Sequence, residues 1–155
     1  MGGELPITEP KECTDMYEFP MFTELFCKML IEECEHYGKW SCGNIDEDKP
    51  YDSRIGNKEN YPTQDIHMNQ IGLNKVWLDI VKKYISRVAK KMYNDLTTKG
   101  YNIAFIVKYT LDGQSELKPH HDCSVYSTVT CLNTDFEGGG THFIRQNYTH
   151  HSAGI

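Results

Sequence analysis

Two side chains spaced two positions apart, His120 and Asp122, form the feature of this sequence best suited to metal chemistry. In extended backbone, residues i and i+2 project to the same side, so this imidazole and this carboxylate can reach one ion while His121 points away. Two such ligands and a distant histidine make the facial triad of a non-haem Fe(II) oxygenase, which leaves one face of the metal open. A His-x-Asp triplet also arises by chance, and a plain hydrogen-bonded pair is the alternative interpretation.

The segments around this pair show the alternation typical of β-strands. Before it, apolar and aromatic residues fall at every second position of residues 103–109: Ile103, Phe105, Val107 and Tyr109. This alternation predicts a strand with Tyr109 on its inward face. After the pair, residues 125–132 and 141–148 are further strand candidates, and the three glycines at 138–140 predict a tight turn before the second of them.

Two amphipathic helices are predicted earlier in the chain, which places the sequence in the α+β class with helices packed on a sheet or barrel. The first covers residues 22–37, where apolar residues recur at helical spacing before a terminal glycine: Phe22, Leu25, Phe26, Met29, Leu30, Cys34 and Gly38. The second covers residues 74–93 with Asn74 as N-cap, and its predicted buried face consists of Val76, Trp77, Ile80, Val81, Tyr84, Ile85, Val88 and Met92. Its lysines and arginine are expected to face water. A long exposed loop at 43–62 and a short strand at 66–71 are expected between the two helices.

Composition and charge exclude several classes of protein. The chain has 155 residues, of which 39% are hydrophobic and 25% charged, so one globular core is expected rather than a disordered or low-complexity chain. The net charge of −6 argues against nucleic acid as a partner. No stretch reaches the ~20 apolar residues of a membrane span. Residues 1–10 lack the pattern of a signal peptide, and we expect no secretory targeting from this chain as given.

A second Asp–His pair, Asp65 and His67, repeats the spacing of the metal pair in inverted order. A strand with satisfied polar groups is the favoured interpretation here, and a second metal site is the alternative. Trp40 and Trp77 are expected to anchor the core. The alternation leaves open whether His142, on a later strand, faces a pocket or solvent.

Seven sequence blocks, in order from residue 13 to residue 145, resemble the C-terminal catalytic domain of the procollagen lysyl hydroxylases, which are Fe(II)- and 2-oxoglutarate-dependent dioxygenases. They are Met16-Tyr17-Glu18-Phe19-Pro20, Glu35-His36-Tyr37-Gly38-Lys39-Trp40-Ser41, Glu59-Asn60-Tyr61-Pro62-Thr63, Asp65-Ile66-His67-Met68, Phe105-Ile106-Val107-Lys108-Tyr109, Pro119-His120-His121-Asp122 and Phe136-Glu137-Gly138-Gly139-Gly140. The blocks Asp-Ile-His-Met and Pro-His-His-Asp are specific to these hydroxylases among 2-oxoglutarate oxygenases.

The resemblance implies a double-stranded β-helix (jelly-roll) core supported by N-terminal helices. It also implies that His120 and Asp122 are iron ligands and that Tyr109 lines the 2-oxoglutarate pocket. The implied reaction hydroxylates lysine in collagen-type Xaa-Lys-Gly sequences, with Fe(II), 2-oxoglutarate and L-ascorbate as cofactors. The implied partners are procollagen or collagen-like lysine peptides, and the implied setting is the lumen of the endoplasmic reticulum, with a homodimer and peripheral membrane association.

The sequence departs from the family pattern at its C-terminal end. In the family, the third ligand is a later histidine, and an arginine about ten residues beyond it pairs with 2-oxoglutarate, whereas this chain ends at Ile155 and His150 and His151 follow Asp122 too closely to be read as that ligand. We therefore expect residues 1–12 to be a flexible lead-in and residues 13–155 to be a partial dioxygenase domain, incomplete at its C-terminus. A truncated, non-catalytic remnant with at most weak metal binding is the alternative, and a cupin-like metal-binding module is a third.

Overall fold

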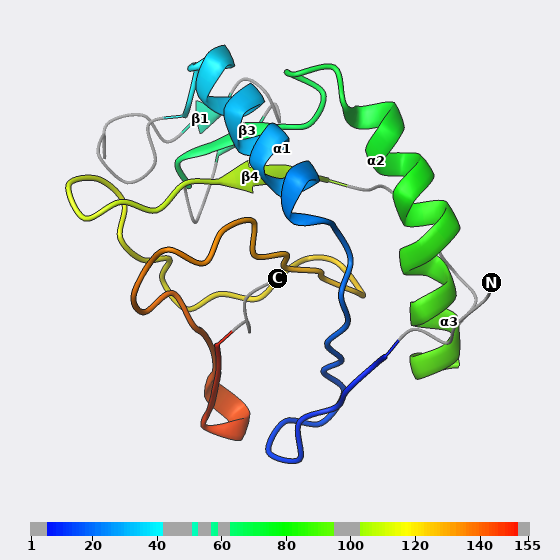
Figure 1. Ribbon diagram of the computed structural model, residues 1–155. Coiled ribbons are helices and arrows are strands. Elements are labelled where there is room, and N and C mark those ends of the chain that lie inside the picture. Colours follow the sequence, from blue (N-terminus) through cyan, green and yellow to red (C-terminus); the bar gives the residue numbers. More distant parts are fainter. Residues whose placement is uncertain (1–5, 42–50, 53–56, 59–62, 95–102, 152–155) are drawn as a thin grey trace.

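The computed structural model describes residues 6–41, 51–52, 57–58, 63–94 and 103–151 (Figure 1). In chain order the elements are α1 (Glu24–Tyr37), β1 (Tyr51–Asp52), β2 (Asn57–Lys58), β3 (Asp65–His67), α2 (Asn74–Ile80), the π-helical turn η2 (Val81–Ile85), α3 (Ser86–Tyr93), β4 (Phe105–Val107), β5 (Thr141–Phe143), the 3-10 turn η3 (Ile144–Gln146) and β6 (Tyr148–His150). None of the helices in this described part is long and apolar enough to cross a membrane.

The described strands form three antiparallel pairs, β1 with β2, β3 with β4, and β5 with β6. The pair β1–β2 falls within the loop expected at 43–62, and the rest of that range lies outside the described residues. The strand expected at 66–71 is shorter than predicted, because the chain turns after His67, with the Gln70 N–H donating to the His67 carbonyl at 2.9 Å. The double-stranded β-helix stays a prediction.

The strand predicted over residues 125–132 was wrong, since this range carries no helix or strand in the structure. Its alternating valines are exposed, Val125 by 85% and Val129 by 78%. Alternation makes a strand only when a neighbouring strand supplies hydrogen bonds and a surface to pack on. The segment instead contributes Leu132, which packs against the core.

Helix α1 (Figure 1) begins at Glu24, two residues after the predicted start, and ends at the predicted residue. The Thr23 hydroxyl accepts a hydrogen bond from the Phe26 N–H at 3.3 Å, which satisfies a donor that the first turn leaves free. Gly38 follows the last turn with φ +66°, and its N–H donates to the Cys34 carbonyl at 3.0 Å. Only glycine adopts this left-handed conformation at no steric cost, so the predicted stop is confirmed.

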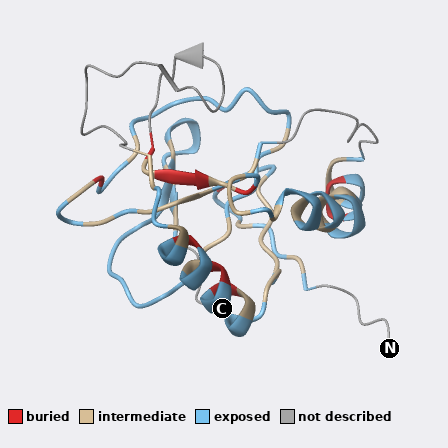
Figure 2. Cartoon of the chain, turned by 90° about the horizontal axis from the view of Figure 1, so that it is seen from above, coloured by how far each residue is buried: buried red, intermediate tan, exposed pale blue. Residues whose placement is uncertain are grey.

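The core lies between α1 and the β3–β4 pair (Figure 2). Its buried members are Leu30, Cys34 and Ile66, and the partly buried side chains around them are Phe26, Tyr37, Trp40, Ile71, Leu73, Ile106 and Leu132. Two residues assigned to the buried face from the sequence are exposed, Leu25 by 68% and Met29 by 59%. At 100° per residue, both lie more than a quarter turn from the centre of the buried face. The apolar pattern of the sequence is therefore wider than the face that the sheet covers.

The second helix runs without interruption from α2 through η2 to α3. Asn74 is its first helical residue rather than its N-cap, a position that Leu73 takes. At the wider π turn the Ser86 hydroxyl donates to the Val81 carbonyl at 2.8 Å, five residues back. The basic face is exposed as predicted: Lys82, Lys83, Arg87, Lys90 and Lys91. The apolar face is only partly covered, because Val88 and Ala89 are buried while Val76 is 45% and Tyr84 57% exposed.

Strand β4 turns the opposite face to the core from the one predicted. Ile106 packs against the core, whereas Ile103 and Phe105 are 48% and 46% exposed. The face predicted to point inward, which consists of every second residue up to Tyr109, therefore lies away from α1. The reason is the pairing with β3, in which Ile106 stands opposite the buried Ile66 and Phe105 opposite His67.

The N-terminal residues are linked to the chain that follows them. Thr8 and Glu18 exchange two backbone hydrogen bonds of 2.9 Å each, although Thr8 falls within the lead-in expected over residues 1–12. The turn predicted at the three glycines lies earlier than expected, because the chain bends at Phe136 and Glu137. Gly138 and Gly139 follow with positive φ before β5 begins at Thr141.

Candidate metal centre

The two predicted ligands lie next to each other on the segment between β4 and β5. His120 Nε2 is 3.2 Å from Asp122 Oδ1, and the two side chains are 30% and 49% exposed. The segment forms no strand, so their convergence comes from the local backbone rather than from a sheet. His121, between them, is exposed. The predicted juxtaposition of imidazole and carboxylate is therefore present, on a surface that other molecules can reach.

A backbone carbonyl orients the imidazole of this pair. His120 Nδ1 lies 2.9 Å from the Lys118 carbonyl oxygen, which can only accept, so Nδ1 carries the proton. In a neutral imidazole this leaves the lone pair on Nε2, the atom that faces Asp122. A metal ligand of this type is held by such a hydrogen bond from its other ring nitrogen. The donor set of one imidazole nitrogen and one carboxylate oxygen suits Fe(II).

The described residues contain no group of three or more His, Cys, Asp and Glu side chains that could share one ion. His150 belongs to the end of β6, where Nε2 lies 3.8 Å from the Glu18 carboxylate. His142 on β5 is exposed, and its Nδ1 lies 2.9 Å from the hydroxyl of Thr149 on β6. The sequence left the direction of His142 open, and the structure assigns it to the surface of the β5–β6 pair.

Tyr109 lies two residues beyond the end of β4 and is 49% exposed. Burial of the remaining part raises the pKa of its phenol above the ordinary value of 10.0, so the hydroxyl stays protonated and able to donate at neutral pH. Its role in holding 2-oxoglutarate stays a prediction.

The Asp65–His67 pair forms a satisfied polar network. The Ser41 hydroxyl accepts from the Asp65 N–H at 2.7 Å and donates to the Thr63 carbonyl at 2.5 Å. The Thr63 hydroxyl donates to the Asp65 carboxylate, whose other oxygen lies 3.7 Å from His67 Nε2. Asp65 is 1% exposed. The sequence missed Ser41 and Thr63, although Thr63 stands two positions before Asp65, on the same face of an extended chain.

Two of the resemblance blocks meet at Lys108. Its ammonium lies 2.7 Å from the Glu35 carboxylate and 5.2 Å from the centre of the Trp40 ring. Ser41, next to Trp40, ties the same segment to Asp65 on β3 through a backbone hydrogen bond of 3.0 Å. This cluster fixes the end of α1 against the β3–β4 pair. Spacing along the chain could not reveal it, because its members lie 73 positions apart.

Comparison with known proteins gives one family match. The model of the OGFOD2-like domain matches residues 5–98. Procollagen-lysine,2-oxoglutarate 5-dioxygenase 2 of Mus musculus is 47% identical over 140 residues, which are 87% of this chain and 18% of that protein. Procollagen-lysine,2-oxoglutarate 5-dioxygenase 1 of Gallus gallus is 46% identical over the same shares. The procollagen lysyl hydroxylase and glycosyltransferase of Acanthamoeba polyphaga mimivirus is 42% identical over 139 residues, 88% of this chain and 15% of that protein.

The chain belongs to the OGFOD2-like domain family, whose model covers more than half of it. Its relatives at about 45% identity are procollagen-lysine 2-oxoglutarate 5-dioxygenases, which confirms the resemblance inferred from the seven blocks. The chain spans less than a fifth of the length of these relatives.

Proposed function

We propose that this chain takes part in the hydroxylation of peptidyl lysine in collagen-type sequences, with Fe(II) and 2-oxoglutarate as cofactors. The observation that carries the proposal is the His120–Asp122 pair, 3.2 Å apart and oriented by the Lys118 carbonyl. The names of its relatives support the reaction class, because they describe dioxygenases that use procollagen lysine and 2-oxoglutarate.

The residues divide the work by their chemistry. His120 Nε2 and Asp122 Oδ1 would hold the ion, and the hydrogen bond from Nδ1 to the Lys118 carbonyl would keep the ring in the ligating tautomer. Bound iron with 2-oxoglutarate supplies the oxidising power that side chains lack. Tyr109, whose raised pKa keeps its hydroxyl protonated, would donate a hydrogen bond to a carboxylate of the keto acid.

The metal site is tested by titrating the purified chain with Mn(II), a redox-stable stand-in for Fe(II), in a calorimeter. We expect His120→Ala and Asp122→Asn each to weaken metal binding at least about tenfold, since each removes one of the protein ligands. His121→Ala is the matched control, because this exposed neighbour should leave the affinity unchanged. Equal affinity in all four proteins would refute the site.

Turnover is tested with Fe(II), 2-oxoglutarate, L-ascorbate and a Gly-Xaa-Lys peptide, by measuring succinate and hydroxylysine. Succinate that depends on the peptide and on His120 supports the enzyme. Metal binding without turnover would instead assign the chain the role of a non-catalytic remnant. The lumen of the endoplasmic reticulum is the proposed setting, since collagen-type lysines are the proposed substrates.

A further inference from the structure

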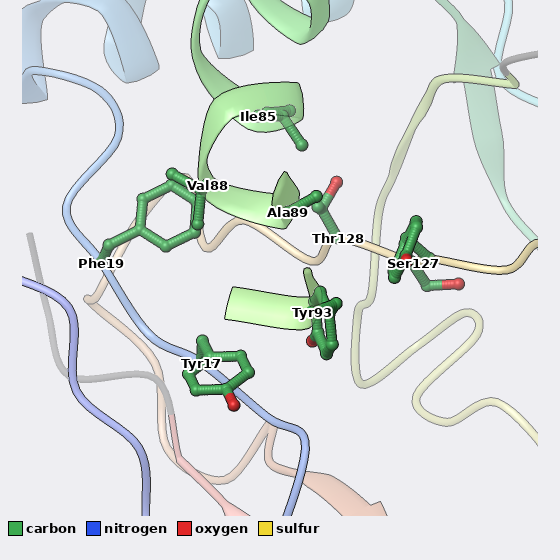
Figure 3. A pocket seen from close by; sticks show the side chains of 9 residues that line it. Tyr17, Phe19, Ile85, Val88, Ala89, Tyr93, Ser127 and Thr128 are labelled. Carbon is green, nitrogen blue, oxygen red and sulfur yellow. The ribbon is translucent and has the colours of Figure 1, made fainter. Parts of the chain in front are cut away.

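The segment that follows the metal pair runs from α3 to α1. Near its start, Tyr126 packs against Tyr93 of α3 with ring centroids 4.9 Å apart, and both side chains line a small hollow (Figure 3). Near its end, the Thr130 hydroxyl donates to the Met21 sulfur at 4.0 Å, shortly before α1 begins. Residues 123–132 form no helix or strand, so side-chain contacts hold them in this position.

Contacts on both sides of Cys131 place this residue beside the first half of α1. The residue before it makes the contact with Met21, and the residue after it, Leu132, packs against the core cluster that contains Leu30. Cys27 stands between Met21 and Leu30 in the chain, shares the buried face of α1 with Leu30, and is 1% exposed. The path of the segment therefore brings Cys131 to the level of Cys27.

The two thiols also influence each other. Burial, and after it the charge that Cys131 carries when ionised, raises the pKa of the Cys27 thiol. Repulsion between two thiolates weakens with distance, so this effect requires the two sulfur atoms to lie close together. Both are free thiols in the structure, with Cys27 buried and Cys131 half-buried. Cys34, two turns further along α1, lies about 10 Å from Cys27 and is too distant to bridge it.

We propose that Cys27 and Cys131 form a disulfide bond that fastens the segment after the metal pair to α1. Formation of this bond follows from the positions of the two residues and does not depend on the proposed function. Its occurrence in the cell rests on the lumen of the endoplasmic reticulum as the setting, because disulfides persist in such oxidising compartments.

A low-molecular-weight disulfide such as oxidised glutathione supplies the oxidant. The thiolate of the more accessible Cys131 attacks one glutathione sulfur, which forms a mixed disulfide and releases one glutathione. The Cys27 thiol then gives its proton to solvent, and its thiolate attacks the Cys131 sulfur and releases the second glutathione. Two protein thiols are oxidised to one disulfide, while one glutathione disulfide is reduced to two thiols.

The bond would restrain the segment that carries the metal pair at its start. Asp122 stands nine positions before Cys131, and the chain between them includes Val125 and Val129, which are 85% and 78% exposed. Local opening of such a segment is what makes it accessible to proteases. A bond at Cys131 opposes that opening, so the oxidised chain should resist cleavage at these valines.

The test incubates the purified chain with oxidised glutathione, blocks the remaining thiols with iodoacetamide and maps linked peptides by mass spectrometry. Chymotrypsin cuts after Phe26 and Tyr126, which separates each of the two cysteines from the cysteine that precedes it in the sequence. We expect one main cross-link, between the peptides of Cys27 and Cys131. A main cross-link to any other cysteine, or glutathione retained on Cys131 beside a free Cys27, would overturn the proposal.

Cys131→Ser and its matched control, Cys123→Ser, test the restraint on the segment. Elastase cuts after small aliphatic residues such as Val125 and Val129. We expect it to cut the oxidised wild type at least about fivefold more slowly than the reduced protein. The difference should persist in Cys123→Ser and disappear in Cys131→Ser. Protection that survives in Cys131→Ser would contradict the restraint, and the peptide map of the wild type does not depend on how either variant folds.

The disulfide and the metal pair can fail separately. His120→Ala should weaken Mn(II) binding and still give the Cys27–Cys131 cross-link, because the contacts that place Cys131 involve neither predicted ligand. Loss of the cross-link in this variant would show that these contacts do not suffice and would overturn the proposed basis of the pairing.

Discussion

At the scale of the residue, burial decides which of the chemically able groups remain reactive. Cys34 is fully buried on the inner face of α1, and burial, with Glu35 and Glu33 nearby, raises the pKa of its thiol to about 11. The exposed Cys123 has none of this cover. Cys34 is therefore a packing residue, and ionisation of its thiol opposes folding.

The raised pKa of the Cys34 thiol lowers the stability of the folded chain at high pH. Between pH 9 and 11 the unfolded chain releases the Cys34 proton while the folded chain keeps it, so the folded state is favoured below pH 9 and loses that advantage as pH rises towards 11. Urea unfolding at pH 8 and pH 10.5 measures the loss. We expect it to be smaller in Cys34→Ala than in the wild type, and unchanged in Cys123→Ala. The same loss in all three proteins would show that Cys34 does not titrate differently on folding.

At the scale of the element, the face that a helix buries is set by the sheet it covers. Helix α1 carries apolar residues around more than half of its circumference, yet only the arc with Leu30 and Cys34 meets the β3–β4 pair. Leu25 and Met29 lie outside this contact. The two leucines of the same helix therefore give a matched comparison of buried and exposed positions.

Leu30→Ala should lower the free energy of unfolding by about 2–5 kcal/mol, because it leaves a cavity beside Ile66. Leu25→Ala should change it by less than about 0.5 kcal/mol, since this side chain is 68% exposed. Chemical denaturation of the two variants measures the difference. A large loss in Leu25→Ala would mean that another surface covers this side of α1 in solution.

At the scale of the whole molecule, the described part of the chain leaves many large apolar side chains exposed. Among them are Phe105 and Tyr109 at and just beyond β4, and Val125 and Val129 further along the chain. Part of the surface that this sequence could bury therefore stays in contact with water.

The urea dependence of unfolding should reflect this. Because the slope of unfolding free energy against urea follows the area that unfolding exposes, we expect a smaller slope than for proteins of equal length that bury such apolar side chains. A slope equal to theirs would show that the exposed apolar residues are covered in solution.

The sequence by itself determined the features that depend on near neighbours. Thr23 and Gly38 set the ends of α1, and the spacing of two positions from His120 to Asp122 allowed these side chains to meet. Such features need only local backbone geometry, which a few residues fix. The family could be inferred from seven ordered blocks for a similar reason, since each block is read locally.

Only the tertiary structure decided which faces meet. The pairing of β3 with β4 turned Ile106 rather than Phe105 to the core, and in the described chain no strand pairs with residues 125–132. A hollow lined by Tyr17, Tyr93 and Tyr126, among others, joins residues more than 100 positions apart (Figure 3). Periodicity shows which face of a helix or strand carries apolar residues. Burial needs a second surface, and distant parts of the chain supply it.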